Sequence, residues 1–240
     1  MSFLKAEWRN LILANYIVDP TILKTYIPKG TELDFHEGKC YVSLVGFMFK
    51  NTRLLGIKIP FHINFEEVNL RFYVKRLERD SSKRGVVFIK ELVPKWALSF
   101  VANTIYKEHY QTVPMKHEWL QSENNLKIRY SWQMKNSWHQ IHVNSESKPS
   151  EIKKGSAVEF ITEHYWGYAK VNDQQTNEYE VTHPIWKQHK VKDYDINVDF
   201  KKVYGENFSF LNQLEPNSVL LASGSEITVE KRNKLKPKDF

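Results

Sequence analysis

Residues 40–50 read CYVSLVGFMFK, and the strand that they predict is apolar on both faces. Successive side chains of a strand point to opposite faces, so an apolar run of this length needs cover on both sides. A closed sheet with a filled interior and helices outside would provide that cover. This stretch therefore predicts one wall of a β-barrel.

The next predicted strand, residues 61–76 (FHINFEEVNLRFYVKR), alternates in polarity. One face is apolar and the other is polar and aromatic: Val68, Leu70, Phe72 and Val74 form the first, and Glu67, Asn69, Arg71 and Tyr73 form the second. Turned into a barrel, the polar face would give a pocket an acid/base group, an amide, a carboxylate-binding fork and a phenol. The alternative is the solvent-facing side of an ordinary amphipathic strand.

The rest of the chain predicts more strands and a few helices. Further strands are expected at residues 7–17, 85–93, 126–135, 165–186 (a hairpin), 191–198, and as a pair at 218–224 and 226–232, with Ser223-Gly224-Ser225 as the turn between the two. Helices are expected after Asp19-Pro20, at 95–106 and 156–164, and in a broken region at 199–214. This pattern predicts an α+β fold of mainly antiparallel β structure, built on a large curved sheet or barrel with flanking helices.

Composition bounds the domain organisation. The 240 residues, 41% of them hydrophobic, can bury a substantial core and fall within the length of one large β-rich domain, so a single domain over 1–240 is expected. The formal charge of +7 comes from scattered lysines, and the densest cluster is KRNKLKPK at 231–238. Residues 231–240 are therefore predicted to be a flexible basic tail, and a nucleic-acid-binding protein is kept only as a third alternative.

The first twenty residues contain only a short apolar run, so we expect neither a signal peptide nor a membrane span. The single cysteine, Cys40, excludes an intrachain disulfide and is expected to be a buried structural thiol. Together these features predict a cytoplasmic protein.

Residues 105–110, IYKEHY, contain a lysine that could attack a carbonyl. Such an amine must be neutral, which requires burial or a neighbouring cation. On a helix, Lys107 would lie within ~20° of Trp96 and Phe100, but at the rim of the apolar stripe. Its neighbour Glu108 would favour the protonated amine. A rim lysine with its charge in water remains the alternative.

The histidines, His164 and His183 above all, suggest a metal site but do not have its spacing. No HExxH or CxxC pattern occurs, and His139 and His142 would point to opposite faces of a strand, so no metal is expected, and no cofactor. His183, beside Pro184, is expected to be a hydrogen-bonded structural histidine rather than a general base.

Several stretches resemble a known family. The opening EWRNLILANYIVDPTILKTYIPKGTELD (residues 7–34) resembles the start of acetoacetate-decarboxylase-like proteins. The whole chain is more similar to the YqjF-like uncharacterised bacterial family of the same superfamily. The stretches that carry this likeness lie between residues 7 and 186: FEEVNLRFYV, RGVVFIKELVPK, EHYWGY and YEVTHPIW.

The resemblance implies a β-cone around a pocket with an arginine, a glutamate and a Schiff-base lysine. Position by position, these roles are carried over to Arg9, Glu67 and Lys107 as the catalytic residues. The decarboxylase has a second lysine directly after its nucleophile, where this chain has Glu108. Since that second cation would lower the pKa of the amine, decarboxylation loses part of its support.

We therefore expect a pocket that binds a small anionic organic molecule, with Asn69, Arg71 and Tyr73 as substrate-binding residues. Lyase-type, decarboxylase-like Schiff-base chemistry at Lys107 is the leading hypothesis. A non-enzymatic binding or sensing module on the same fold is the alternative, so the sequence leaves open whether the chain is an enzyme. The expected partner is the small molecule, with no membrane or nucleic acid, and a homo-oligomer is compatible with the pattern.

Overall fold

The computed structural model describes residues 2–95 and 109–235, which form a mainly antiparallel α+β fold, as the sequence predicts. The helix predicted at 95–106 lies, apart from its first residue, outside the described residues, and so does Lys107. None of the described helices is long and apolar enough to cross a membrane.

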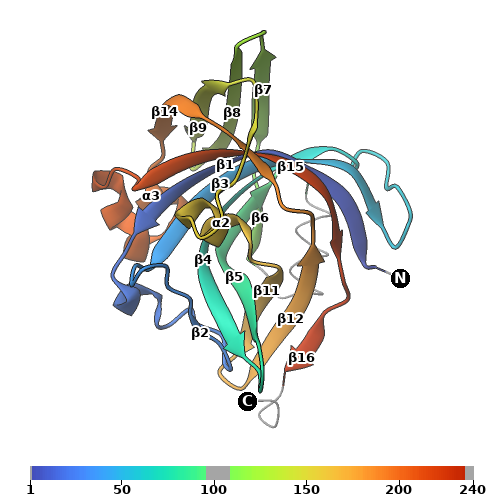
Figure 1. Cartoon of the computed structure of the whole chain (residues 1–240), viewed down its shortest axis with the longest axis vertical. Coiled ribbons are helices and arrows are strands. Elements are labelled where there is room, and N and C mark those ends of the chain that lie inside the picture. The colour runs from blue at the N-terminus through green and yellow to red at the C-terminus, as the bar shows by residue number, and fades with distance from the viewer. Residues whose placement is uncertain (1, 96–108, 236–240) are drawn as a thin grey trace.

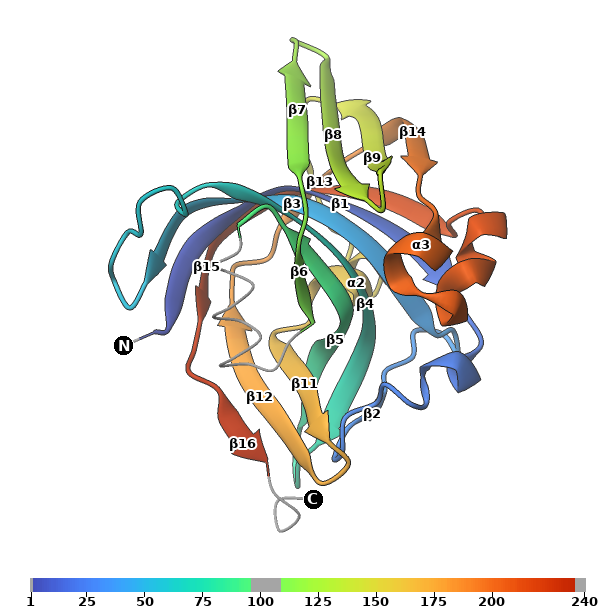
Figure 2. The ribbon, with the colours of Figure 1, turned by 180° about the vertical axis from the view of Figure 1, so that it is seen from behind.

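The larger sheet closes on itself (Figures 1 and 2). Its neighbours follow the order β15-β1-β3-β4-β5-β11-β12, and β12 pairs in turn with β15. These strands are β1 (Leu4–Ile17), β3 (Tyr41–Leu54), β4 (Phe65–Leu77), β5 (Ser82–Val93), β11 (Trp166–Asn172), β12 (Gln175–Thr182) and β15 (Ser218–Val229). Short strands extend it: β2 (Glu32–Leu33), β6 (Tyr110–Thr112), β10 (Ser150–Glu151), β13 (Lys187–His189) and β16 (Asn233–Leu235). We call this assembly the closed sheet.

A second sheet stands at one end of the closed sheet (Figure 1). It has the order β14-β9-β8-β7, with β7 at Met115–Gln121, β8 at Asn125–Met134, β9 at Ser137–Glu146 and β14 at Val191–Asn197. Tyr130 and Trp132 of β8 are fully buried and belong to the core that lies outside the closed sheet. The second sheet therefore covers part of the outer face of the closed sheet.

Short helices cover more of the outer face. They are η1 (Pro20–Leu23), α3 (Phe200–Tyr204) and η3 (Glu206–Gln213), and Figure 2 shows α3 beside the closed sheet. Helix α2 (Ala157–Thr162) instead packs Phe160 and Ile161 on the inner side, with Tyr41 and Tyr73. Aspartates cap the first turns of two of these helices: the side chain of Asp19 accepts from the backbone N–H of Thr21 in η1, as the Asp19-Pro20 step indicates, and Asp199 accepts from that of Lys202 in α3.

Strand β3 is covered on both faces, as its apolar sequence predicts. Val42 and Leu44 pack in the outer core with the helices and the second sheet. Val45, Phe47 and Phe49 pack in an inner core inside the closed sheet. Because both faces are dry, neither needs the polar side chains that a half-exposed strand would carry.

Two predictions near the C-terminus are corrected. Residues 218–229 form the single strand β15, because its pairing with β1 continues on both sides of Gly224, so Ser223-Gly224-Ser225 is not a turn. Residues 233–235, predicted to lie in a flexible tail, form β16, which pairs with β12 and buries Leu235. Backbone hydrogen bonds and one apolar anchor hold this basic segment.

Candidate functional site

A bulge in β1 decides which of its residues face the interior. Asn10 has a left-handed backbone with φ 53°, and the pairing with β3 shifts register between Arg9 and Ile12. The extra residue reverses the alternation, so Trp8 and Leu11 both face inward. Arg9 lies on the opposite face of the strand.

A second bulge, in β5, also changes which residues face the interior. Leu70 of β4 pairs with Lys90, but the next residue, Arg71, pairs with Phe88, which leaves Ile89 unmatched. Phe88 and Glu91 therefore both face inward although they are three residues apart. Without the bulge, the alternation would turn Glu91 away from the interior.

The closed sheet surrounds a cavity of about 140 Å³, to which each of the strands in its circuit contributes lining residues. Most of the wall is apolar and aromatic, including Trp8, Phe47, Phe49, Phe88, Tyr179 and Trp186. Polar side chains lie among them: Glu67, Asn69, Arg71, Glu91, Tyr110 and His164. An apolar cavity with a few convergent polar groups is typical of a small-molecule site.

The polar face of β4 supplies three of these groups, and the fourth residue of that face lies behind them. Glu67, Asn69 and Arg71 line the cavity. The Tyr73 hydroxyl is hydrogen-bonded to Ser43 Oγ at 2.7 Å, and the Arg71 guanidinium lies 5.7 Å from the centre of the Tyr73 ring. Tyr73 is therefore a support for Arg71 rather than part of the wall.

Glu67 is buried in this wall with both of its oxygens hydrogen-bonded. Oε1 accepts from Asn69 Nδ2 at 2.9 Å, and Oε2 accepts from the Tyr110 hydroxyl at 3.1 Å. Burial raises the pKa of Glu67 to about 7, although these two hydrogen bonds and the charge of Arg71 act in the opposite direction. A carboxyl group with this pKa can both donate and accept a proton near neutral pH.

Glu91 lies directly across from Asn69 on the neighbouring strand and is also buried. Tyr110 of β6 lies close to both carboxyl groups. Its pKa is raised well above the ordinary value, first by burial and then by the charges of Glu67 and Glu91. Neither Glu91 nor Tyr110 was predicted from the sequence, because strict alternation places Glu91 on the wrong face and Tyr110 belongs to a three-residue strand.

Arg71 provides the cation of the site. It is buried, its Nη2 donates to the carbonyl of Ile161 over a long 3.5 Å, and its Nε has no hydrogen-bond partner within the part of the chain that the structure describes. The same holds for Oδ1 of Asn69 among these residues. A buried guanidinium with open donors is well suited to a carboxylate.

His164 lies at the Arg71 end of the cavity. Its Nε2 is 3.1 Å from Asp34 Oδ2, which also accepts from Arg84 Nε at 2.7 Å. The ring contacts Tyr73 and Phe160 at centroid distances of 4.7 and 5.0 Å. The sequence presents this histidine only as a candidate metal ligand, because its partner Asp34 is 130 residues away along the chain.

His183 also lines the cavity, stacked on Trp186 at a centroid distance of 4.2 Å. Its Nδ1 lies 2.9 Å from the carbonyl oxygen of Pro184, in keeping with a hydrogen-bonded histidine. Burial lowers its pKa to about 4, so the ring is neutral. Among the described residues no three His, Cys, Asp or Glu side chains form a cluster that could hold a metal ion.

The remaining predicted site residues are not brought to this cavity in the described structure. Arg9 Nη2 forms an ion pair with Glu7 at 2.7 Å on the other face of β1, and Arg9 is absent from the cavity wall that the described residues form. Lys107 lies outside the described residues. Glu67 is thus the one predicted catalytic residue that the described part of the chain places in the wall.

Comparisons with known proteins identify a family and a relative with similar sequences. A family model described as an uncharacterized conserved protein, DUF2071, matches residues 5–226. The uncharacterized protein YqjF of Bacillus subtilis (strain 168) is 27% identical over 199 residues, which are 81% of this chain and 78% of that protein.

Two solved structures resemble the fold over almost the whole chain. Acetoacetate decarboxylase from Legionella pneumophila has a TM-score of 0.64 at 10% identity, covering 97% of this chain and 86% of that chain. The enduracididine biosynthesis enzyme MppR, complexed with the condensation product of pyruvate and imidazole 4-carboxaldehyde, has a TM-score of 0.69 at 10% identity, covering 98% and 90%. The fold is therefore acetoacetate-decarboxylase-like.

Proposed function

The chain belongs to the DUF2071 family, and we propose that its cavity binds a small organic acid with a reactive carbonyl group. The observation that carries the proposal is the pairing of a buried acid/base group, Glu67, with a buried cation, Arg71, in the wall of one cavity. A carboxylate would bind Arg71, and a carbonyl oxygen would lie against Glu67.

The size and walls of the cavity narrow the ligand class. Its volume of about 140 Å³ is comparable to that of cavities that admit a benzene ring, so the ligand has on the order of ten non-hydrogen atoms or fewer. The aromatic wall around Trp8 and Trp186 would favour an apolar tail over a second charged group. Nucleotides and other large ligands are too big for this space.

Lyase-type chemistry at Lys107 extends the proposal. The Lys107 amine would attack the carbonyl carbon and pass one of its protons to the carbonyl oxygen. Protonated Glu67 would give that oxygen a second proton, so water would leave as the protonated imine forms and Glu67 would remain as a carboxylate. In a β-keto acid, the bond to the carboxyl carbon would then break, releasing carbon dioxide and leaving its electron pair on the enamine. The complex of MppR with a condensation product of pyruvate supports carbonyl chemistry on this fold.

The second candidate is a binding or sensing module without turnover. It is favoured by Glu108, which stands where the decarboxylase has a second lysine, because a carboxylate beside the amine would raise its pKa. The two candidates share the ligand class and differ in the role of Lys107. Replacement of Lys107 by methionine would leave binding intact in a sensor and abolish adduct formation in an enzyme.

The test combines binding with trapping. Calorimetry with pyruvate, acetoacetate and related acids should give saturable binding that falls at least tenfold in Arg71→Gln, while the partly exposed Arg129→Gln serves as the matched control. Borohydride reduction followed by peptide mapping should give an adduct on Lys107 that is absent from Lys107→Ala. Binding without an adduct selects the sensing module, and absence of binding across the panel contradicts the proposal.

A further inference from the structure

His164 is held rigidly at the edge of the cavity. It follows α2 directly, and its side chain is 1% exposed. Tyr73 lies against one side of the ring, and Phe160 meets it edge-on. A ring packed in this way on aromatic neighbours has a fixed orientation, so its two nitrogens have separate and constant environments.

The Nε2 nitrogen is occupied by Asp34. Burial alone would raise the pKa of Asp34, but the hydrogen bonds from His164 and Arg84 lower it to about 2, so its carboxylate only accepts. Burial lowers the pKa of His164 to about 4, so the ring is neutral. With Nε2 donating its single proton to Asp34, the Nδ1 nitrogen carries a lone pair and acts as an acceptor.

Nδ1 is the nitrogen that the pairing with Asp34 leaves open. It is buried and has no hydrogen-bond partner among residues 2–95 and 109–235. His164 lines the cavity, whereas Asp34 and Arg84 do not, so the Asp34 side of the ring faces away from the ligand space. A buried acceptor without a donor destabilises the unliganded site, and a ligand carrying a hydroxyl group would recover this cost.

The position of Arg71 sets where that hydroxyl would be. The Arg71 guanidinium lies 5.7 Å and the His164 ring 4.7 Å from the centre of the same Tyr73 ring. The charge of Arg71 also acts on His164 directly and lowers its pKa. Arg71 and His164 therefore lie at the same end of the cavity, and the proposal places the atom next to an Arg71-bound carboxylate on the side of His164.

We propose that His164 is a specificity-determining residue whose Nδ1 accepts a hydrogen bond from a hydroxyl group next to the ligand carboxylate. The pocket then selects small 2-hydroxy acids, or the enol form of 2-keto acids, over acids that lack the hydroxyl. This inference rests on the proposed function, because it requires a carboxylate bound at Arg71. In this arrangement, the hydrogen bond from His164 Nε2 to Asp34 keeps Nδ1 as the acceptor.

Two substitutions test the roles of the two ring nitrogens of His164 separately. The amide of His164→Gln reaches the position of Nε2 and can still donate to Asp34, but it leaves no acceptor at the position of Nδ1. The amide oxygen of His164→Asn lies near the position of Nδ1 and keeps the acceptor, but it loses the bond to Asp34. The probes are 2-hydroxy-4-methylpentanoate and 4-methylpentanoate, which differ only in the hydroxyl group.

Calorimetry of the whole chain should show that the wild type binds the hydroxy acid about tenfold more tightly than its deoxy counterpart. His164→Gln should lose this preference while it still binds the deoxy acid with wild-type affinity, and His164→Asn should keep most of the preference. The ¹⁵N resonance of Nδ1 should move on addition of the hydroxy acid and stay in place with the deoxy acid.

The outcomes distinguish the two proposals. An unchanged preference in His164→Gln, or equal binding of both acids by the wild type, overturns the role of His164 and leaves the acid-binding pocket standing. If neither acid binds the wild type while pyruvate or acetoacetate does, the role of His164 fails and the acid-binding pocket stands. If none of these acids binds, both proposals fail. Circular dichroism of each variant at the assay temperature shows that a lost preference is not lost folding.

Discussion

Among the single residues of the site, Glu67 lowers the unfolding free energy when it is ionised, because its carboxylate is buried. The side chain is 2% exposed, with Arg71 as the cation that acts on it and with Tyr110 and Glu91 nearby. Its hydrogen bonds do not overcome the cost of burial, since its pKa is raised from 4.5 to about 7. A group with a raised folded-state pKa stabilises the fold less as the pH rises through that pKa.

We therefore expect Glu67→Gln to stabilise the protein, and to do so in a pH-dependent way. Gln has the shape of the protonated acid and no charge to bury. At pH 8 the variant should exceed the wild type in unfolding free energy by about 2–3 kcal/mol, and the difference should shrink as the pH falls from 7 towards 4.5. Urea denaturation at a series of pH values measures it.

The matched control is Glu123→Gln, which removes an exposed carboxylate. Its stability should follow the wild-type pH profile. If Glu67→Gln shows a constant difference from the wild type between pH 5 and 8, the carboxyl group does not titrate in that interval and its proposed acid/base role loses its basis. Ligand affinity, measured on the same samples, should fall in Glu67→Gln and stay unchanged in Glu123→Gln.

Among the strands, the two bulges explain why the sequence predicts the inward-facing side chains of β4 but not those of β1 and β5. The alternation of residues 65–74 predicts that Glu67, Asn69 and Arg71 share a face, because no bulge interrupts β4 there. In β5, one unmatched residue reverses the alternation, so period-two reasoning misplaces Glu91. In β1, the bulge turns Arg9, which the family resemblance had placed at the site, to the face outside the wall. A bulge depends on the partner strand, which a single sequence does not specify.

Gly224 shows how closely β15 approaches the bulged strand β1. It lies opposite Arg9 in β15 with φ 73°, and a Cβ atom there would be 2.0 Å from the carbonyl oxygen of Trp8. Real Cβ contacts of that length do not occur, so the backbone of β1 or β15 would have to move. The same β1 bulge carries the carbonyl of Asn10, which accepts from the Tyr130 hydroxyl at 2.9 Å.

We expect Gly224→Ala to lower the unfolding free energy by about 3 kcal/mol or more, because it combines a left-handed backbone with a backbone clash. Gly38→Ala is the matched control: Gly38 has φ 74°, yet a Cβ atom there would meet nothing within 4 Å. It should cost only about 1 kcal/mol of backbone strain. Equal losses in the two variants, measured by urea denaturation, would show that φ alone sets the cost.

In the molecule as a whole, the closed sheet depends on two short junctions. The parallel pairing of β5 with β11 joins Gly85 to Trp166 and Val86 to Gly167, and the pairing of β12 with β15 also involves only two residue pairs. The sequence predicts the strands but not these junctions, since they join segments about 80 and 50 residues apart. Antiparallel hairpins such as β11–β12 were predictable because their partners are adjacent.

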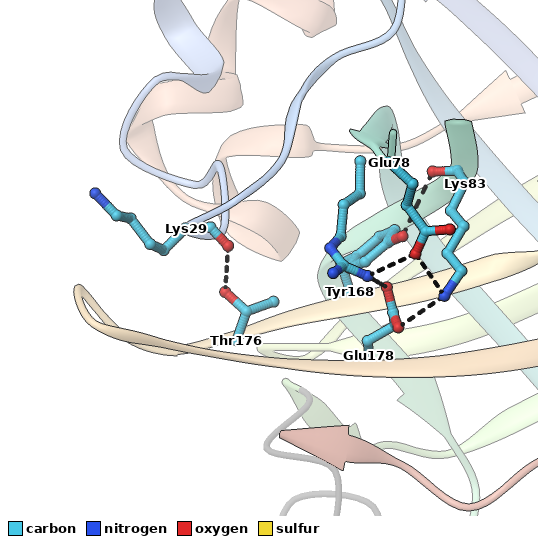
Figure 3. Close-up of polar contacts among 7 residues, drawn as sticks. Lys29, Glu78, Lys83, Tyr168, Thr176 and Glu178 are labelled. Atoms are coloured by element: carbon cyan, nitrogen blue, oxygen red, sulfur yellow. Dashed lines mark hydrogen bonds and ion pairs between the residues drawn. The ribbon is translucent and has the colours of Figure 1, made fainter. Parts of the chain in front are cut away.

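An ion-pair network spans the first junction (Figure 3). Glu178 of β12 accepts from Arg76 at 3.1 Å and from Lys83 at 3.4 Å, and these two cations also pair with Glu78 in the β4–β5 turn. The Tyr168 hydroxyl of β11 donates to the carbonyl oxygen of Lys83 at 3.4 Å. Two residues before Glu178 in β12, Thr176 donates to the carbonyl oxygen of Lys29, as the same figure shows.

The buried carboxylate of Glu178 should therefore matter more than ion pairs on the surface. Its side chain is 3% exposed, so Glu178→Gln would leave Arg76 and Lys83 partly buried beside a weaker acceptor. We expect a loss of about 2 kcal/mol in unfolding free energy, reduced from the fully buried case because Lys83 is 25% exposed. Amide exchange should rise first in β11 and β12, because their junction with β5 is short.

Glu151→Gln provides the comparison. Glu151 pairs with Lys187 at 2.7 Å, a shorter distance than any in the Glu178 network, but both side chains are more than half exposed. Its loss should be within about 0.5 kcal/mol of zero, since solvent screens the pair. If the two variants lose the same stability, or if exchange in Glu178→Gln rises evenly over all strands, the network does not hold the junction, and closure of the sheet depends on packing around Gly85 and Gly167 alone.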